Sequence, residues 1–142
     1  MPGIVVGIDG SDNSRKALEW AVREAGLRGT SLTVLAVHQV ATNYWTGAAE
    51  TYAADAPETE MVRQAAEDAV QKAVSQVGEP APTSVTVRAV SGVAARELVA
   101  ASADADLVVV GSRGGGGFAR IRLGSVSSQV ASHADSPVVV IR

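Results

Sequence analysis

A glycine-rich stretch carries the residues whose types and spacing are best suited to chemistry. Residues 111–125 read Gly-Ser-Arg-Gly-Gly-Gly-Gly-Phe-Ala-Arg-Ile-Arg-Leu-Gly-Ser and lie between a buried apolar run and a predicted helix. Glycine lets backbone N–H groups converge without a Cβ atom in the way, and a helix N-terminus adds aligned donors with a partial positive charge. The stretch therefore predicts a polyphosphate site, in which Ser125 adds a hydroxyl and further charge comes from Arg113, Arg120 and Arg122. The alternative is a flexible surface loop without a ligand.

A second candidate is Asp9, which ends the first apolar run of the chain. A carboxylate at the carboxyl end of a strand is an exposed acceptor that can bond ribose hydroxyls or the amine of adenine. The alternative is a local Asx turn or helix cap, formed together with Ser11 and Asp12. The sequence leaves both interpretations open.

These residues need a scaffold, and the apolar pattern predicts its elements. We expect strands at residues 4–9, 31–38, 85–90, 107–110 and 137–142. Apolar residues at helical spacing, with capping residues at several ends, predict helices at residues 11–28, 57–77, 92–103 and 124–134. Residues 40–56, which include Tyr44 and Trp45, show no clear period and are predicted to form a loop that could cover a site.

Strands that alternate with helices predict an α/β protein with a five-stranded, parallel, doubly wound sheet, Rossmann-like and with helices on both faces. We expect the strand order 3-2-1-4-5 and a single domain over residues 1–142, because no repeat or linker interrupts the chain. In such sheets the ligand crevice lies at the carboxyl ends of the strands, where the winding direction reverses. Asp9 and residues 111–125 follow the two strands at that point.

Composition argues against several classes of function. The chain is 46% hydrophobic but only 4% aromatic, which suits aliphatic strands buried on both faces. A net charge of -3 gives no general attraction to nucleic acid or anionic lipid. The absence of cysteine excludes disulfides, thiolate metal sites and a cysteine nucleophile. With no basic leader and no apolar run near the roughly 20 residues that span a bilayer, a cytoplasmic protein is expected.

Other phosphate-binding and catalytic motifs are absent. A Walker loop requires Gly-Lys followed by Ser or Thr, and neither Lys16 nor Lys72 follows a glycine. Residues 9–14 lack the three spaced glycines of the dinucleotide fingerprint. The Asp and Lys that mark receiver domains of two-component signalling are missing after the third and fifth strands. His38 and His133 lie far apart in the sequence, so no metal site is predicted.

The spacing within residues 111–125 is specific. Gly111, two residues, Gly114, nine residues and then Gly124-Ser125 match the G-2x-G-9x-G-[S/T] signature of the ATP-binding branch of the universal stress protein family. The resemblance covers nearly the whole chain, and the chain looks most like bacterial members of the family. It implies a fold of the adenine nucleotide alpha hydrolase type, with an adenine pocket at the ends of the first two strands and the phosphates in the glycine-rich loop.

The resemblance also implies site residues one by one. Gly7 and Asp9 match positions that line the adenine and ribose end, and Gln39, at a position where the family usually has an apolar residue, would give backbone contacts to adenine. The phosphate end would be formed by Gly111, Ser112, Arg113, Gly114, Gly115, Gly116, Gly117, Gly124, Ser125 and Val126. ATP is the expected ligand, accompanied by Mg or Mn, and no residue is assigned as catalytic or as a metal ligand.

The final predicted strand indicates how the chain could associate with a second copy. Residues 137–142 are apolar and lie at a sheet edge in the predicted order, which favours a homodimer formed through this strand. A dimeric, ATP-binding regulator of the stress response, acting on a protein partner that the sequence does not identify, is the leading hypothesis. The alternatives are slow ATP hydrolysis or autophosphorylation, with Ser125 as a possible acceptor, and an interaction module that binds no nucleotide.

Overall fold

The computed structural model describes residues 3–39, 42–43, 48–49, 57–112 and 124–142. Its main sheet has five parallel strands in the order β5-β2-β1-β6-β7. The strands are β1 (Ile4–Ile8), β2 (Leu32–Gln39), β5 (Val85–Gly92), β6 (Leu107–Gly111) and β7 (Val138–Ile141). Counted along the chain, this is the order 3-2-1-4-5, so the predicted fold class is confirmed.

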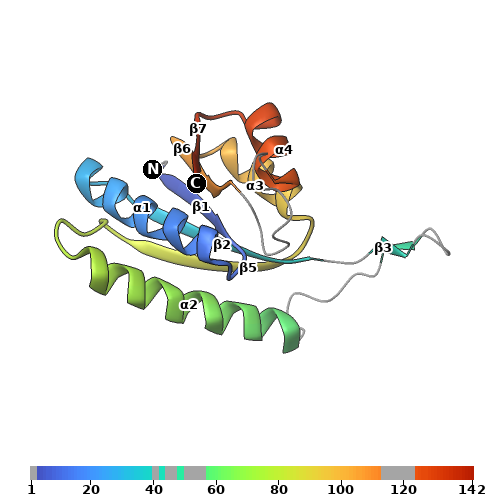
Figure 1. Cartoon of the computed structure of the whole chain (residues 1–142), viewed down its shortest axis with the longest axis horizontal. Coiled ribbons are helices and arrows are strands. Elements are labelled where there is room, and N and C mark those ends of the chain that lie inside the picture. Colours follow the sequence, from blue (N-terminus) through green and yellow to red (C-terminus); the bar gives the residue numbers. More distant parts are fainter. Residues whose placement is uncertain (1–2, 40–41, 44–47, 50–56, 113–123) are drawn as a thin grey trace.

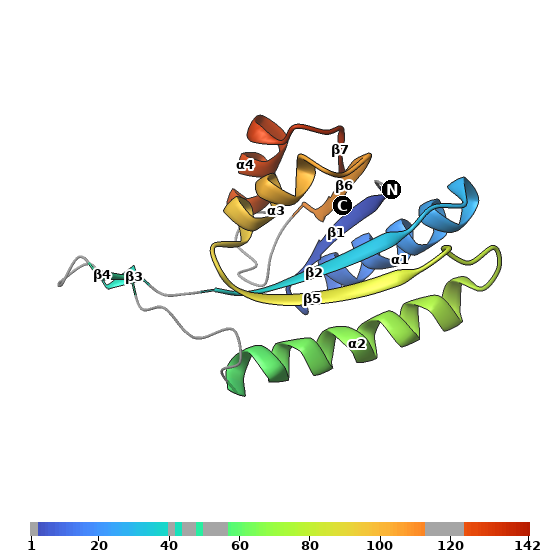
Figure 2. The same cartoon turned by 180° about the vertical axis from the view of Figure 1, so that it is seen from behind.

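Within the described residues, four helices cover the two faces of the sheet (Figures 1 and 2). Helices α1 (Asp12–Arg28) and α2 (Pro57–Val77) lie on one face, and α3 (Ala94–Ser102) and α4 (Ser125–His133) lie on the other. Side chains alternate along each strand, so Val6 packs on the α1 side while Val5 packs on the α3 side. No helix within the described ranges is both long and apolar enough to cross a membrane.

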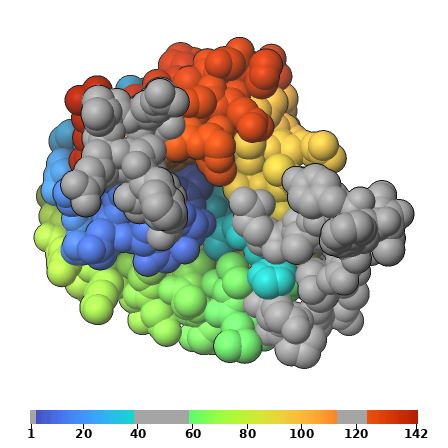
Figure 3. All heavy atoms as spheres, turned by 45° about the vertical axis from the view of Figure 1, so that its right-hand side comes forward, coloured from blue at the N-terminus to red at the C-terminus, as the bar shows by residue number. Residues whose placement is uncertain are grey.

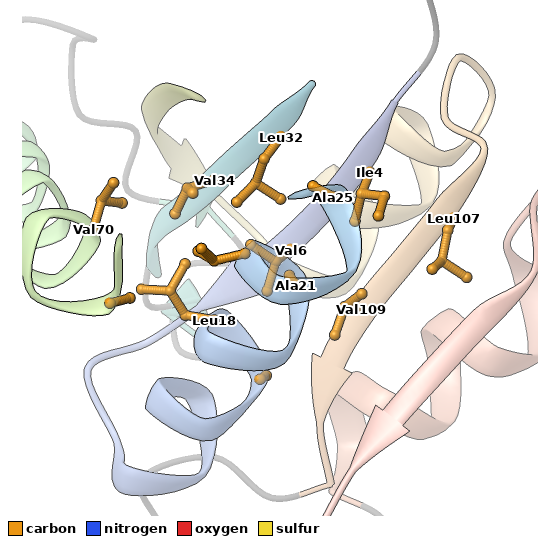
Figure 4. Packing of buried hydrophobic residues seen from close by; sticks show 13 residues of the cluster. Ile4, Val6, Leu18, Ala21, Ala25, Leu32, Val34, Val70, Leu107 and Val109 are labelled. Carbon is orange, nitrogen blue, oxygen red and sulfur yellow. The ribbon is translucent and has the colours of Figure 1, made fainter. Parts of the chain in front are cut away.

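The core between the sheet and α1 is made of small aliphatic side chains (Figure 4). Leu18, Ala21 and Ala25 recur at helical spacing on α1 and meet Val6 of β1 and Val109 of β6. Val6 and Val109 are completely buried. Burying a side chain such as Val or Leu stabilises the fold by roughly 1.5–3 kcal/mol, so this stripe anchors the helix whose first turn reaches the candidate site.

Helix ends follow the capping chemistry that the sequence indicates. Ser11 caps α1, and its Oγ accepts a hydrogen bond from the Ser14 N–H at 3.2 Å. Gly29 ends α1 at φ 64°, and Gly78, which follows α2, has φ 75°. Both glycines adopt the left-handed conformation that side chains disfavour, so the predicted stops are confirmed.

Two predicted boundaries are wrong by two residues, and the other boundaries agree with the structure to within one residue. The strand predicted to end at Val90 continues to Gly92, because Ser91 and Gly92 pair with His38 and Gln39 of β2. Helix α3 therefore begins at Ala94 rather than at Gly92.

Residues 40–56 differ in part from the predicted loop. Within them β3 (Thr42–Asn43) pairs with β4 (Ala48–Ala49) in an antiparallel ribbon. The ribbon lies beyond the end of the main sheet, away from the helices (Figures 1 and 2). The rest of the stretch, with Tyr44 and Trp45, lies outside the described residues, so the covering role expected of this loop stays a prediction.

Candidate functional site

The turn between β1 and α1 is built by a closed set of hydrogen bonds. The Ser11 N–H donates to Oδ1 of Asp9 at 2.9 Å, and the Asp9 N–H donates to Oγ of Ser14 at 3.2 Å. The Ser14 hydroxyl in turn donates to the Ser11 carbonyl at 3.0 Å. The Asx turn considered for Asp9 is therefore present. Asp9 is exposed, and its second carboxylate oxygen makes no hydrogen bond within the described residues, which leaves that oxygen for a ligand hydroxyl.

Gly7 lies under helix α3. A Cβ atom added to Gly7 would lie 2.7 Å from Cδ1 of Leu98, a buried residue of α3. This contact gives Gly7 a packing role: glycine lets the helix approach the strand. Gly7 is on the same face of the sheet as α3 and α4, which is also the face to which the alternation assigns Asp9.

Gln39 ends β2 and pairs with Gly92, the last residue of β5. The backbone of Gln39 therefore lies at the carboxyl end of the sheet, three residues beyond Ala36, which pairs with Ile8 at the end of β1. Helix α3 starts from this edge as well, with Val93 as its N-cap residue and without a side-chain cap.

Gly111 lies against the first turn of α1. A Cβ atom there would come 2.7 Å from Oδ1 of Asn13 and 3.1 Å from the Asn13 carbonyl oxygen. Gly111 is thus a close-approach glycine: without a side chain, the end of β6 can meet the start of α1. This requirement is independent of any ligand.

Ser112 is the junction that positions the glycine-rich loop. It is buried, its N–H donates to the Ile141 carbonyl of β7 at 2.7 Å, and its hydroxyl donates to Oδ1 of Asn13 at 3.2 Å. Its carbonyl accepts the Gly124 N–H and lies 3.1 Å from the hydroxyl of Ser127 in α4. The two ends of the loop, Ser112 and Gly124, are therefore directly hydrogen-bonded to each other.

This junction places the N-terminus of α4 at the carboxyl edge of the sheet. Gly124 is the N-cap residue and makes no side-chain cap, so among the described residues nothing caps the N–H donors that a helix N-terminus leaves without an intrahelical partner, beginning with that of Ser125. Ser125 is exposed and Val126 is half-buried. Figure 3 views this end of the molecule, where α1 (blue), α3 (yellow-orange) and α4 (orange-red) lie around the ends of the strands. An anion is the natural ligand of such an end.

The structure thus brings several predicted site residues to one edge of the sheet: Asp9 and Gly7 from β1 and its turn, Gln39 from β2, Gly111 and Ser112 from the end of β6, and Gly124, Ser125 and Val126 from the start of α4. Other predicted phosphate-end residues lie outside the described residues: Arg113, Gly114, Gly115, Gly116 and Gly117. Their part in the site stays a prediction, as does that of Arg120 and Arg122.

A separate groove of about 490 Å³ runs between α1 and α2. Leu18, Ala69 and Ala73 are among its apolar lining residues, and Arg15 and Lys72 are among its charged ones. It borders the tip of β1 at Ile8 and Gly10 but is lined by none of the predicted nucleotide-site residues. It is therefore distinct from the cleft that the sequence predicts at the ends of β1 and β2.

Sequence reasoning missed Asn13 and Ser127, which hold Ser112 and with it the two ends of the loop. Their polar character and their positions near strand ends are the signal in the sequence, but this signal does not indicate that they form hydrogen bonds with the distant Ser112. In the part of the chain that the structure describes, no group of three or more His, Asp and Glu side chains could hold a metal ion.

Comparison with known proteins decides the family. A model of the universal stress protein family matches residues 2–142. The chain belongs to the universal stress protein family. A universal stress protein of Mycolicibacterium smegmatis is 37% identical to it over 141 residues, which are 98% of this chain and 47% of that protein. The chain thus spans about half the length of the relatives it matches.

Solved structures of the family share the fold. The universal stress protein UspA from Lactobacillus plantarum superposes with a TM-score of 0.76 at 26% identity, covering 99% of this chain and 97% of that one. A universal stress protein in complex with cAMP has a TM-score of 0.67 at 26% identity, covering 99% and 96%. One from Archaeoglobus fulgidus in complex with dAMP has a TM-score of 0.61 at 26% identity, covering 100% and 98%.

Proposed function

We propose that this universal stress protein binds ATP at the carboxyl edge of its sheet and uses the nucleotide to regulate a protein partner. The base and ribose lie at the ends of β1 and β2, near Asp9 and the Gln39 backbone, and the phosphates lie on the N-terminus of α4. Two solved relatives, in complex with cAMP and dAMP, support an adenine nucleotide as the class of ligand.

One observation carries the proposal. The Ser112 carbonyl binds the Gly124 N–H, so the N-terminus of α4, which lacks a side-chain cap, is held beside the end of β6. The strand order reverses there, since β1 and β6 are neighbours while the chain winds outward from them in both directions. Crevices at this position bind ligands in open parallel sheets, and an uncapped helix start supplies donors for phosphate.

A divalent ion, Mg or Mn, would accompany the triphosphate. The described side chains form no cluster of three metal ligands. The ion would therefore be held by phosphate oxygens, and the Ser125 hydroxyl could add an oxygen ligand from the protein. When bound, such an ion neutralises phosphate charge. Fast phosphoryl transfer is not part of the proposal, and slow hydrolysis or autophosphorylation stays an alternative for direct assay.

The proposal includes a homodimer formed through β7. This strand lies at the sheet edge, and all its residues are half-buried. The carbonyl of Pro137 accepts the N–H of Val108 in β6, and that of Ile141 accepts the N–H of Ser112 just after β6. Alternation therefore turns the N–H and C=O groups of Val138 and Val140 toward the free edge. An apolar edge strand with unpaired backbone groups favours pairing with a second copy. The cytoplasmic location stays a prediction.

Calorimetric titration tests the function. The purified chain, freed of nucleotide by partial unfolding and refolding, is titrated with ATP, AMP and GTP in the presence and absence of Mg. Saturable binding of ATP, weaker binding of AMP and no detectable binding of GTP are expected, because the base and the phosphates are both recognised. The absence of heat with millimolar ATP would overturn the proposal in favour of an interaction module without nucleotide.

A further inference from the structure

Asn13 makes a contact that its own turn does not need. The β1–α1 turn is closed by Asp9, Ser11 and Ser14 alone, and Ser11 is the residue that caps the helix. Asn13 is half-buried in the first turn of α1, and its Oδ1 accepts the hydroxyl of Ser112, a residue 99 positions away. The side chain therefore makes a tertiary contact with the end of β6.

The contact joins the two ends of the proposed nucleotide site. On one side, Asn13 belongs to the helix that begins directly after Asp9 and its turn. On the other, Ser112 holds Gly124 and Ser127, the residues that fix the start of α4. The hydroxyl of Ser112 is thus bonded to α1 and its carbonyl to α4.

Two further observations show that this junction is tightly built. Gly111 approaches Asn13 so closely that a Cβ atom would lie 2.7 Å from its Oδ1. Ser112 is only 6% exposed, and each of its polar groups is engaged: the N–H by Ile141, the hydroxyl by Asn13 and the carbonyl by Gly124 and Ser127. A buried hydroxyl that loses its acceptor retains its desolvation penalty, so the junction is sensitive to the loss of Asn13.

We infer that Asn13 is a positioning residue, which holds the N-terminus of α4 at the right place for phosphate by accepting the Ser112 hydroxyl. The assignment of phosphate as the ligand rests on the proposed function, while the positioning of α4 does not. Asn13 touches no ligand in this scheme. It acts through Ser112, and its effect falls on the phosphate end of the site rather than on the base end.

The first arm of the test needs no nucleotide. Amide hydrogen exchange by NMR is compared in the wild type, Asn13→Ala, Ser112→Ala, Asn13→Asp and the control Lys16→Ala, which changes an exposed residue of the same helix. In Asn13→Ala and Ser112→Ala the Gly124 amide exchanges about five- to tenfold faster, the net worth of one hydrogen bond. Asn13→Asp keeps an acceptor and restores protection. The amide of Val22, in the α1 core, reports any global destabilisation.

The second arm compares ATP with adenosine by calorimetry. Asn13→Ala weakens ATP binding about five- to tenfold and adenosine binding less than twofold, because only the phosphate end moves. The double variant Asn13→Ala/Ser112→Ala is no weaker than the worse single variant, as expected when both remove one shared bond. A general loss of structure would weaken both ligands equally.

The outcomes separate the two claims. Unchanged exchange of the Gly124 amide in Asn13→Ala overturns the inference, and so does a loss of affinity that is equal for ATP and adenosine. If the wild type binds neither ligand, the nucleotide function fails, while the exchange arm still decides whether Asn13 positions α4. Lys16→Ala behaves as the wild type in both arms.

Discussion

At Ser125 the proposed phosphate site can be tested by removing a single backbone N–H group. It is the first helical residue of α4, where proline is well tolerated, and Gly124 before it has φ -65° and ψ 165°, an extended conformation that suits a residue preceding proline. Ser125→Pro therefore removes one N–H without breaking the helix. We expect ATP affinity to fall about 10- to 100-fold, the range for hydrogen bonds to charged groups, measured by calorimetry.

Ser125→Ala is the matched control, because it removes the hydroxyl and keeps the N–H. Its ATP affinity should fall by less than about fivefold, a neutral hydrogen bond at most. Both variants should retain the wild-type melting temperature. Equal affinity of Ser125→Pro and the wild type would show that the phosphates do not lie on this helix end.

Asp9 combines a structural and a proposed binding role, and two substitutions separate them. Asn retains the oxygen that accepts the Ser11 N–H, whereas Ala removes it. Asp9→Ala should destabilise the protein by about 1 kcal/mol, while Asp9→Asn should cost less than about 0.5 kcal/mol, measured by urea denaturation.

Both Asp9 variants should bind ATP more weakly, because a neutral or absent group accepts less well from ribose hydroxyls. A two- to tenfold loss is the expected order of magnitude for Asp9→Asn. Full affinity in Asp9→Asn would leave Asp9 with the Asx turn as its sole role.

At the scale of elements, the packing of α1 depends on Gly26. A Cβ atom there would lie 1.9 Å from the carbonyl oxygen of Pro80, in the connection between α2 and β5. Because backbone cannot move aside as a side chain can, Gly26→Ala should destabilise the fold by about 2–3 kcal/mol. Urea denaturation measures the change.

The neighbouring Leu27→Ala is the control for that experiment. Leu27 is 66% exposed, so its truncation should change stability by less than about 0.5 kcal/mol. Helix propensity alone predicts the opposite result for Gly26, a gain of up to about 1 kcal/mol on replacement by Ala. A stabilised Gly26→Ala would therefore contradict the close approach.

The elements themselves are largely predictable from the sequence, since their signals are local. Apolar residues in runs or in alternation indicate the five strands of the main sheet, and Ser11, Gly29 and Gly78 indicate helix ends through capping. Helix α3 is less predictable: its buried residues are Ala95, Leu98 and Ser102, while Ala101 is only partly buried against the same cluster. Ala and Ser differ too little in hydrophobicity to define a face by themselves.

The site is less predictable than the elements, because its contacts join distant residues. The glycine spacing indicates the loop and its ligand class, yet nothing local pairs Asn13 with Ser112 across 99 positions. Likewise the family resemblance implies that Gly7 and Gly111 serve a ligand, whereas the structure shows that an added side chain would meet Leu98 at Gly7 and Asn13 at Gly111. Glycines required for packing and for binding are indistinguishable in a single sequence.

At the scale of the whole molecule, the proposed dimer depends on the free edge of β7. Val140→Pro removes an outward N–H and leaves the pairing of Pro137 and Ile141 with β6 in place. We expect this variant to be folded but monomeric in sedimentation or light scattering. Val140→Thr, which is β-branched and keeps the N–H, should remain a dimer. A dimeric Val140→Pro would place the interface elsewhere.

The central claim is that adenine nucleotide binds at the carboxyl edge of the sheet with its phosphates on α4, and an NMR titration with ATP tests it most directly. The claim predicts saturable shifts of the Gln39, Ser125 and Val126 amides, with little change at Lys72 and Gln76 in the groove between α1 and α2. Shifts confined to that groove, or none with millimolar ATP, would contradict it.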